Sequence, residues 1–388
     1  MSARAATAAR PLLTRRLAPR ARVIPVVARS GDRWIVATVA ALVSLGVVMV
    51  FNTSYFFAGQ RFGDPLFVFR KHLASIVLGL ACCFTASRVR SSTYERLAYP
   101  ALAVVTVLLL AVLVPGVGLV RGGARRWIGF GALNLQPSEM AKVVAVLYLA
   151  KSIVRKGPQL KTFSLGVLPH VIVVGVLAGL VVVEPDFGTA ALLGVTLFAM
   201  LFAGGVRWRD LGMPLVPVLL LAIYAVHSSP YRLRRVMGFM DPWEHPRDAG
   251  FQLVQSFLAF GSGGLFGAGL GESKQKMFFL PEAHTDFIFA VIGEELGLIG
   301  ALMLVGLFAL LVVRGLRVAL NHPTLFGRLV AFGITSVIVM QAGINMAVVL
   351  GLLPTKGLAL PFVSYGGSAM LGAMTAVGVL LALSRESG

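Results

Sequence analysis

The fold of this chain is organised around residues 278–300, which read FFLPEAHTDFIFAVIGEELGLIG. This stretch ends the long polar loop of the sequence and begins an apolar helix. The apolar run 286–313 would extend about 42 Å as a helix, whereas the hydrocarbon core of a bilayer is about 30 Å thick. Because Asp286, Glu294 and Glu295 all lie in its first half, that half is expected to protrude. Asp286 should then face lipid headgroups.

The composition is that of a polytopic helical membrane protein. Of 388 residues, 57% are hydrophobic and 13% are charged, with a mean hydropathy of +0.85. The net charge of +19 is spread over short loops between apolar spans, so a nucleic-acid partner is not expected. Cys82 and Cys83 are adjacent and are the only cysteines, which excludes a disulfide framework and a zinc site.

Ten apolar runs have the length of a membrane span, which predicts an all-α fold with about ten transmembrane helices. A large extracytoplasmic loop, 228–285, separates the seventh helix from the eighth. The runs lie near 34–54, 68–87, 97–119, 136–154, 164–183, 187–205, 211–227, 286–313, 326–349 and 362–383.

The distribution of positive charge predicts the topology. Residues 1–33 carry eight Arg and one Asp and are interpreted as a disordered cytoplasmic tail, and 34–388 as the membrane domain. The bias of Lys and Arg towards the side of this tail places both termini in the cytoplasm. Within the large loop we expect two short helices, 231–239 and 248–260, and then a flexible glycine-rich rim at 261–271.

The Lys and Arg residues on the predicted extracytoplasmic loops need a further explanation, because positive charge on translocated loops opposes the positive-inside rule. An anionic ligand at the outer leaflet would supply one. The alternative is that these side chains neutralise outer carboxylates or touch lipid phosphates.

Other charged residues are expected at the same outer level. Glu139 and Lys142 are three apart on one helix and can form an ion pair near a cavity, although Lys142 alone could snorkel to the interface. Glu184 and Asp186 flank Pro185 in a tight turn, where they are either functional or merely solvated.

Taken together, these motifs resemble the SEDS family of bacterial cell-wall polymerases, and its division-specific branch more than its elongation branch. The likeness covers the chain from about residue 30 to its end. It rests on 123–128 (GARRWI), 136–139 (QPSE), 184–189 (EPDFGT), 248–252 (DAGFQ), 280–297 and 354–368.

The resemblance implies an enzyme that polymerises lipid II into glycan strands. Asp286 matches the family's essential acidic residue, and Glu139 and Lys142 match a charged pair that we assign to structure. Glu184 and Asp186 are secondary catalytic candidates. Residues expected to bind the diphosphate or the sugar of the substrate are Arg125, Lys356, Ser364 and His284.

Such chemistry requires a base that accepts the proton of the acceptor hydroxyl, and we expect Asp286 to be this base. It also requires cations that stabilise the leaving diphosphate. No resident metal is predicted, although Mg²⁺ or Mn²⁺ could accompany the substrate. The resemblance also implies a class B penicillin-binding protein as partner, and a location in the inner membrane at the division septum. The alternatives are a lipid II flippase or other transporter, and a non-catalytic division scaffold.

Overall fold

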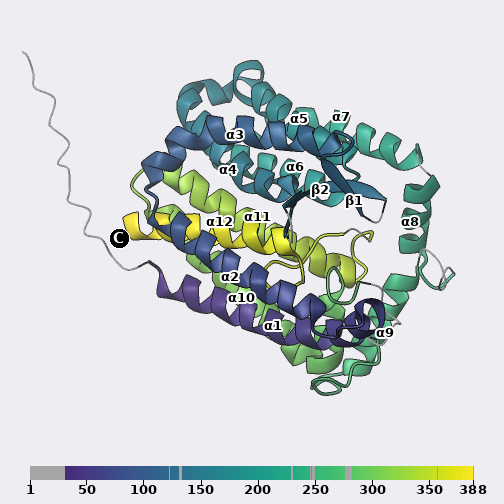
Figure 1. Ribbon diagram of the computed structural model, residues 1–388. Coiled ribbons are helices and arrows are strands. Elements are labelled where there is room, and N and C mark those ends of the chain that lie inside the picture. The colour runs from purple at the N-terminus through teal and green to yellow at the C-terminus, as the bar shows by residue number, and fades with distance from the viewer. Residues whose placement is uncertain are drawn as a thin grey trace, which may run out of the picture.

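The computed structural model describes residues 31–387, apart from positions 122, 131–132, 229, 245, 247–249, 276–281 and 356. Its long helices lie side by side along one direction, and the short strands and two shorter helices gather at one end (Figure 1). The α-helices are α1 (Arg33–Phe62), α2 (Phe67–Arg88), α3 (Ser91–Leu113), α4 (Pro137–Lys156), α5 (Leu168–Val183), α6 (Phe187–Ala203), α7 (Trp208–His227), α8 (Pro230–Met240), α9 (Phe251–Gly263), α10 (Ile288–Asn321), α11 (Leu325–Val349) and α12 (Gly367–Glu386).

Each apolar run predicted from the sequence overlaps one α-helix, so the all-α polytopic class is confirmed, although the run 97–119 continues past the end of α3 into strand β1 (Gly118–Arg121). Seven of the described helices are long and apolar enough to cross a membrane, and α6 is apolar but shorter. The count of ten crossings therefore stays a prediction. The two helices expected inside the large loop are present as α8 and α9.

Both described ends of the chain lie at the same end of the bundle (Figure 1). The backbone N–H of Asp32 donates a hydrogen bond to Ser384 Oγ at 3.1 Å. The chain between them must therefore cross the bundle an even number of times. Which side of the membrane this end faces is a prediction from the charge bias.

A small sheet at the opposite end was not predicted. It comprises β1 (Gly118–Arg121), β2 (Ala124–Phe130) and β3 (Leu133–Leu135), paired antiparallel in the order β1-β2-β3. These strands are too short and too basic to register in a search for apolar spans. The turn residues at 122–123 between them, Gly-Gly, were the available signal for a hairpin.

The helix that follows Asp286 is broken at Gly297, whose φ of 66° and ψ of −165° are not helical. The break frees backbone groups that a continuous helix would pair. The glycine-rich segment 264–269 pairs them instead. Ala268 N and Gly269 N donate to the carbonyls of Glu294 and Glu295, while Leu298 N and Ile299 N donate to the carbonyls of Gly264 and Leu265, at 2.9–3.2 Å.

These contacts correct the prediction of a flexible rim at 261–271. A Cβ at Gly267 would lie 2.1 Å from the carbonyl oxygen of Glu295, and one at Gly297 would lie 2.4 Å from Gly267 N. Glycine is needed here because two backbones touch, and the segment is packed against α10.

Glu294 and Glu295 fix the same loop. Both are buried, at 3% and 1% exposure. Glu294 accepts hydrogen bonds from Ser273 Oγ and Lys274 N, and Glu295 accepts one from Asn52 Nδ2. Asn52 lies roughly 29 Å along α1 from Arg33, close to the thickness of a hydrocarbon core. The two carboxylates are thus held inside protein, and their position at the membrane boundary stays a prediction.

Candidate active site

Asp286 lies in the turn that leads into α10, and its backbone is held on both sides. Asn345 Nδ2 donates to the carbonyl of Asp286 at 2.8 Å and to that of Leu358 at 2.7 Å. The neighbouring carbonyl of Thr285 accepts from Ser364 Oγ at 2.5 Å. Two segments distant in the sequence, α11 and the loop 358–364, therefore position this one residue.

The carboxylate of Asp286 is not a helix cap. The N-cap of α10 is Phe287, and no side chain caps this helix. The Asp286 carboxylate instead faces Gly357, because a Cβ at Gly357 would lie only 3.0 Å from Asp286 Oδ2. The absence of a side chain at Gly357 leaves open the space in front of the carboxylate.

The pKa of Asp286 is raised to about 7, mainly by burial and also by the negative charges of Glu282 and Asp186, against the lowering effect of Arg126 and Arg235. A position at the start of a helix favours a negative charge and would by itself lower this pKa. Desolvation and like charges nevertheless leave it raised. A pKa near 7 suits a general base at neutral pH.

Arg126 on β2 is the cation that sequence reasoning missed. Its Nε donates to the carbonyl of Glu184 at 2.8 Å, and one Nη donates to that of Pro185 at 2.5 Å. Arg125, which the sequence suggested instead, donates through Nη1 to the carbonyl of Leu113 at 3.1 Å. The structure therefore brings Arg126, and not Arg125, into the electrostatic surroundings of Asp286.

A second cation comes from α8. Arg235 acts on the charge of Asp286 and donates to the carbonyl of Thr355 at 3.4 Å. Arg232 on the same helix lies over the ring of Phe187, 4.3 Å from its centroid. The large loop thus contributes positive charge next to the 354–360 loop.

The other predicted substrate-binding residues lie around the same turn, with different surroundings. Ser364 is buried, and its hydroxyl accepts a bond from Leu360 N at 2.9 Å while donating to Thr285. His284 packs between the rings of Phe57 and Tyr365, and burial lowers its pKa. Lys356 lies outside the described residues. A role in substrate binding stays a prediction for all three.

Glu139 and Lys142 form the ion pair that their spacing predicted. Lys142 Nζ lies 2.7 Å from Glu139 Oε2 and donates to Gln341 Oε1 at 2.7 Å, with all of these side chains buried. Gln341 in turn donates to the carbonyl of Ala359 at 2.8 Å. The pair therefore connects α4 and α11 to the loop that faces Asp286.

The two secondary candidates differ from each other. Asp186 caps α6, accepting hydrogen bonds from the backbone and hydroxyl of Thr189 and from Gln136 Nε2. Glu184 is fully buried, and neither of its carboxyl oxygens has a hydrogen-bond partner.

Among the described residues, no three His, Cys, Asp or Glu side chains are grouped so that they could hold a metal ion.

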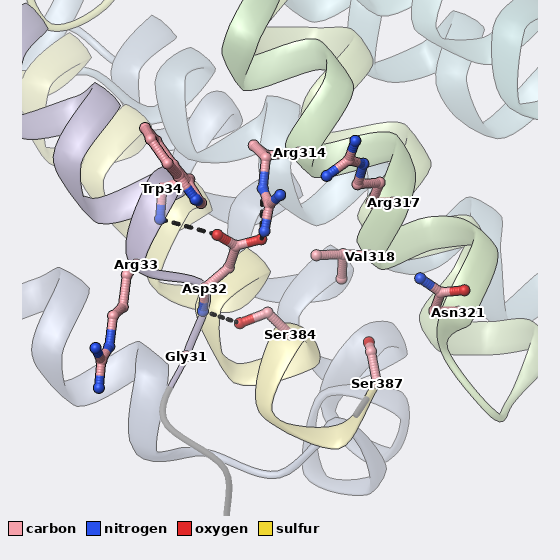
Figure 2. Close-up of a pocket in the computed structure, with 10 residues that line it drawn as sticks. All are labelled: Gly31, Asp32, Arg33, Trp34, Arg314, Arg317, Val318, Asn321, Ser384 and Ser387. Atoms are coloured by element: carbon pink, nitrogen blue, oxygen red, sulfur yellow. Dashed lines mark hydrogen bonds and ion pairs between the residues drawn. The ribbon is translucent and has the colours of Figure 1, made fainter.

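A cavity of about 430 Å³ lies at the opposite end of the bundle, where the described chain begins and ends (Figure 2). Its principal carboxylate, Asp32, is fully engaged, accepting from Arg314 at 2.8 and 2.5 Å and from Trp34 N at 2.9 Å. This arrangement fastens α1 to α10.

The fold and the site together define a polytopic helical membrane protein that holds one partly exposed carboxylate among arginines at one face. The family model for FtsW, RodA and SpoVE, described as a cell cycle protein, matches residues 32–388. The chain belongs to this family, and the resemblance drawn from the motifs is confirmed.

Individual relatives agree with this assignment. The probable peptidoglycan glycosyltransferase FtsW of Geobacter metallireducens is 45% identical over 353 residues, covering 91% of this chain and 94% of that protein. A chain from a peptidoglycan synthase complex that coordinates polymerization and crosslinking matches with a TM-score of 0.76 at 31% identity, covering 92% of this chain and 98% of that one. RodA of Thermus thermophilus matches with a TM-score of 0.65 at 30% identity, covering 92% and 97%.

Proposed function

We propose that this chain is a peptidoglycan glycosyltransferase that polymerises lipid II into glycan strands at the outer face of the cytoplasmic membrane during septal cell-wall synthesis. The observation that carries the proposal is the placement of Asp286, with its raised pKa, within the field of Arg126 and Arg235. A base and fixed cations at one position are what transfer from a diphosphate-linked sugar requires.

The reaction forms one bond and breaks one. A GlcNAc hydroxyl oxygen attacks the anomeric carbon of MurNAc while the bond from that carbon to the diphosphate oxygen breaks. The electron pair of the broken bond leaves with undecaprenyl diphosphate, whose charge Arg126 and Arg235 stabilise. The hydroxyl proton passes to the Asp286 carboxylate, which must therefore be ionised at the start of each cycle.

A partner is part of the proposal. One solved relative belongs to a complex that coordinates polymerization and crosslinking. The described residues here form helices and one small sheet, with no domain suited to peptide crosslinking. We assign that chemistry to a class B penicillin-binding protein, whose membrane helix would pack on the exposed apolar side chains of α10, such as Leu298, Leu302 and Met303.

Polymerisation can be tested with purified protein in detergent, alone and with its cognate penicillin-binding protein. Labelled lipid II is expected to become a ladder of glycan products on a gel. A transporter would leave lipid II intact, because transport breaks no covalent bond of its substrate. Intact lipid II with a folded, assembled complex would reject the enzymatic proposal.

Changing Arg126 to Gln is expected to raise KM for lipid II roughly tenfold to a hundredfold, because a charge-assisted contact to the diphosphate is lost. The matched control is Arg125→Gln on the same strand, for which a smaller effect is expected, because Arg125 bonds to the end of α3. Initial rates over a range of lipid II concentrations give both values. A larger effect of Arg125→Gln would contradict this assignment and favour Arg125, the residue first suggested by the sequence, as the one that binds the diphosphate.

A further inference from the structure

The turn between α5 and α6 contains a buried carboxyl group for which the mechanism above has no use. Glu184 has 0% exposure, and both of its carboxyl oxygens lack a hydrogen-bond partner. Its neighbour Asp186, only two residues away, has its carboxylate satisfied by Thr189 and Gln136. An ionised carboxylate buried without hydrogen bonds is costly, whereas a protonated one is far less so.

Arg126 lies beside this group but does not bond to its carboxyl. Its guanidinium donates to two backbone carbonyls, those of Glu184 and Pro185. Carbonyl oxygens position a guanidinium without cancelling its charge. The guanidinium also has more N–H donors than these two bonds use, so it retains donors for an anionic ligand.

We propose that Glu184 is a positioning residue which stays uncharged beneath Arg126, so that the charge of the arginine remains available to the leaving diphosphate. The inference rests on the proposed function, because it gives Arg126 a diphosphate to bind. If Glu184 were ionised, it would attract the same guanidinium across a low-dielectric region and compete with the substrate.

The electrostatics of the turn agree with this role. The pKa of Glu184 is raised to about 8, mainly by burial and also by the charge of Asp186, against the lowering effect of Arg126. Among the described residues, the charged groups that act on Glu184 are Asp186, two residues along the chain, and Arg126, from β2. With its pKa near 8, most of the Glu184 population carries its proton at pH 7 and loses it above pH 8.

Glycan polymerisation should therefore fall at alkaline pH through weaker substrate binding. With a pKa of about 8, about nine-tenths of Glu184 is ionised at pH 9, so this ionisation alone should make kcat/KM at pH 9 about tenfold lower than it would be with Glu184 fully protonated. Glu184→Gln keeps the shape of the protonated group and cannot ionise. In this variant the ratio of kcat/KM at pH 9 to that at pH 7 should be about tenfold higher than in the unchanged protein.

The experiment measures kcat/KM for labelled lipid II from pH 7 to pH 9.5 with the full complex, for the unchanged protein, Glu184→Gln and Arg126→Gln. Because Glu184 acts through Arg126, the alkaline fall should also vanish in Arg126→Gln. An unchanged fall in Glu184→Gln would overturn the inference. If that variant does not fold, a fall that persists in Arg126→Gln overturns it instead. Absence of any glycan from the unchanged protein would instead reject the proposed function, on which the inference rests, and is distinguished in this way from a failure of the Glu184 assignment alone.

Discussion

Replacing Asp286 by Asn is expected to lower the rate of lipid II polymerisation by about a hundredfold or more while leaving the protein folded and bound to its partner. Asn keeps the size of the side chain but cannot accept the acceptor proton at neutral pH. A structural role predicts a small effect, yet Asp286 caps no helix, and its fixed backbone is held through carbonyl groups that Asn also has. Activity and stability should therefore separate.

The matched control is Asp64→Asn, which makes the same chemical change in the short turn between α1 and α2. Asp64 pairs with the exposed Arg70 and has no contact with the site. Its variant should polymerise at the original rate. Near-normal polymerisation by Asp286→Asn would remove Asp286 from the mechanism and make Glu184 and Asp186 the next candidates.

Breaking the buried pair of Glu139 and Lys142 is expected to produce the largest loss of stability. Lys142→Met leaves the Glu139 carboxylate and the Gln341 side chain without their shared donor, and Glu139→Ala leaves the Lys142 ammonium without its counter-ion. Removing one partner of a buried pair typically costs about 3–5 kcal/mol. Thermal unfolding in detergent should show a clear fall in Tm for each single variant.

Two comparisons sharpen this expectation. The double variant Glu139→Gln with Lys142→Met should recover part of the loss, because no unpaired charge remains. Arg70→Ala, which removes an exposed ion pair, should hardly change Tm. If Glu139→Ala retained both its Tm and its polymerisation, the assignment of this pair to structure would be wrong.

The helices were predictable because length and apolarity alone decide what can cross a membrane. Asp286 and the pair of Glu139 and Lys142 were found for a related reason, since charges inside or beside apolar spans are few and their helical spacing is readable. The short strands carried no such signal. In a β-strand, successive side chains point to opposite faces, so Arg125 and Arg126 point in opposite directions. Because no strand was predicted here, the two arginines could not be told apart from the sequence.

The break in α10 could not have been placed from the sequence. Glycine at 297 and at 263–271 is compatible with a flexible loop and with two backbones in contact. Only the backbone segment that each glycine contacts distinguishes these cases, and that segment lies about thirty residues away along the chain. The raised pKa of Asp286 was not predicted for the same reason, because the burial and the neighbouring Asp186 carboxylate that raise it are produced by the fold.

The central claim, that ionised Asp286 is the base, is tested most directly by the pH dependence of polymerisation between pH 5 and pH 7.5. Because the pKa of Asp286 is raised to about 7, the carboxylate is protonated and inactive below that pH, and kcat/KM should rise roughly tenfold per pH unit towards it. Glu282→Gln removes a negative charge that raises this pKa, so the rise should move to lower pH. A rate independent of pH in this range, or a rise that stays in place in Glu282→Gln, would contradict the account.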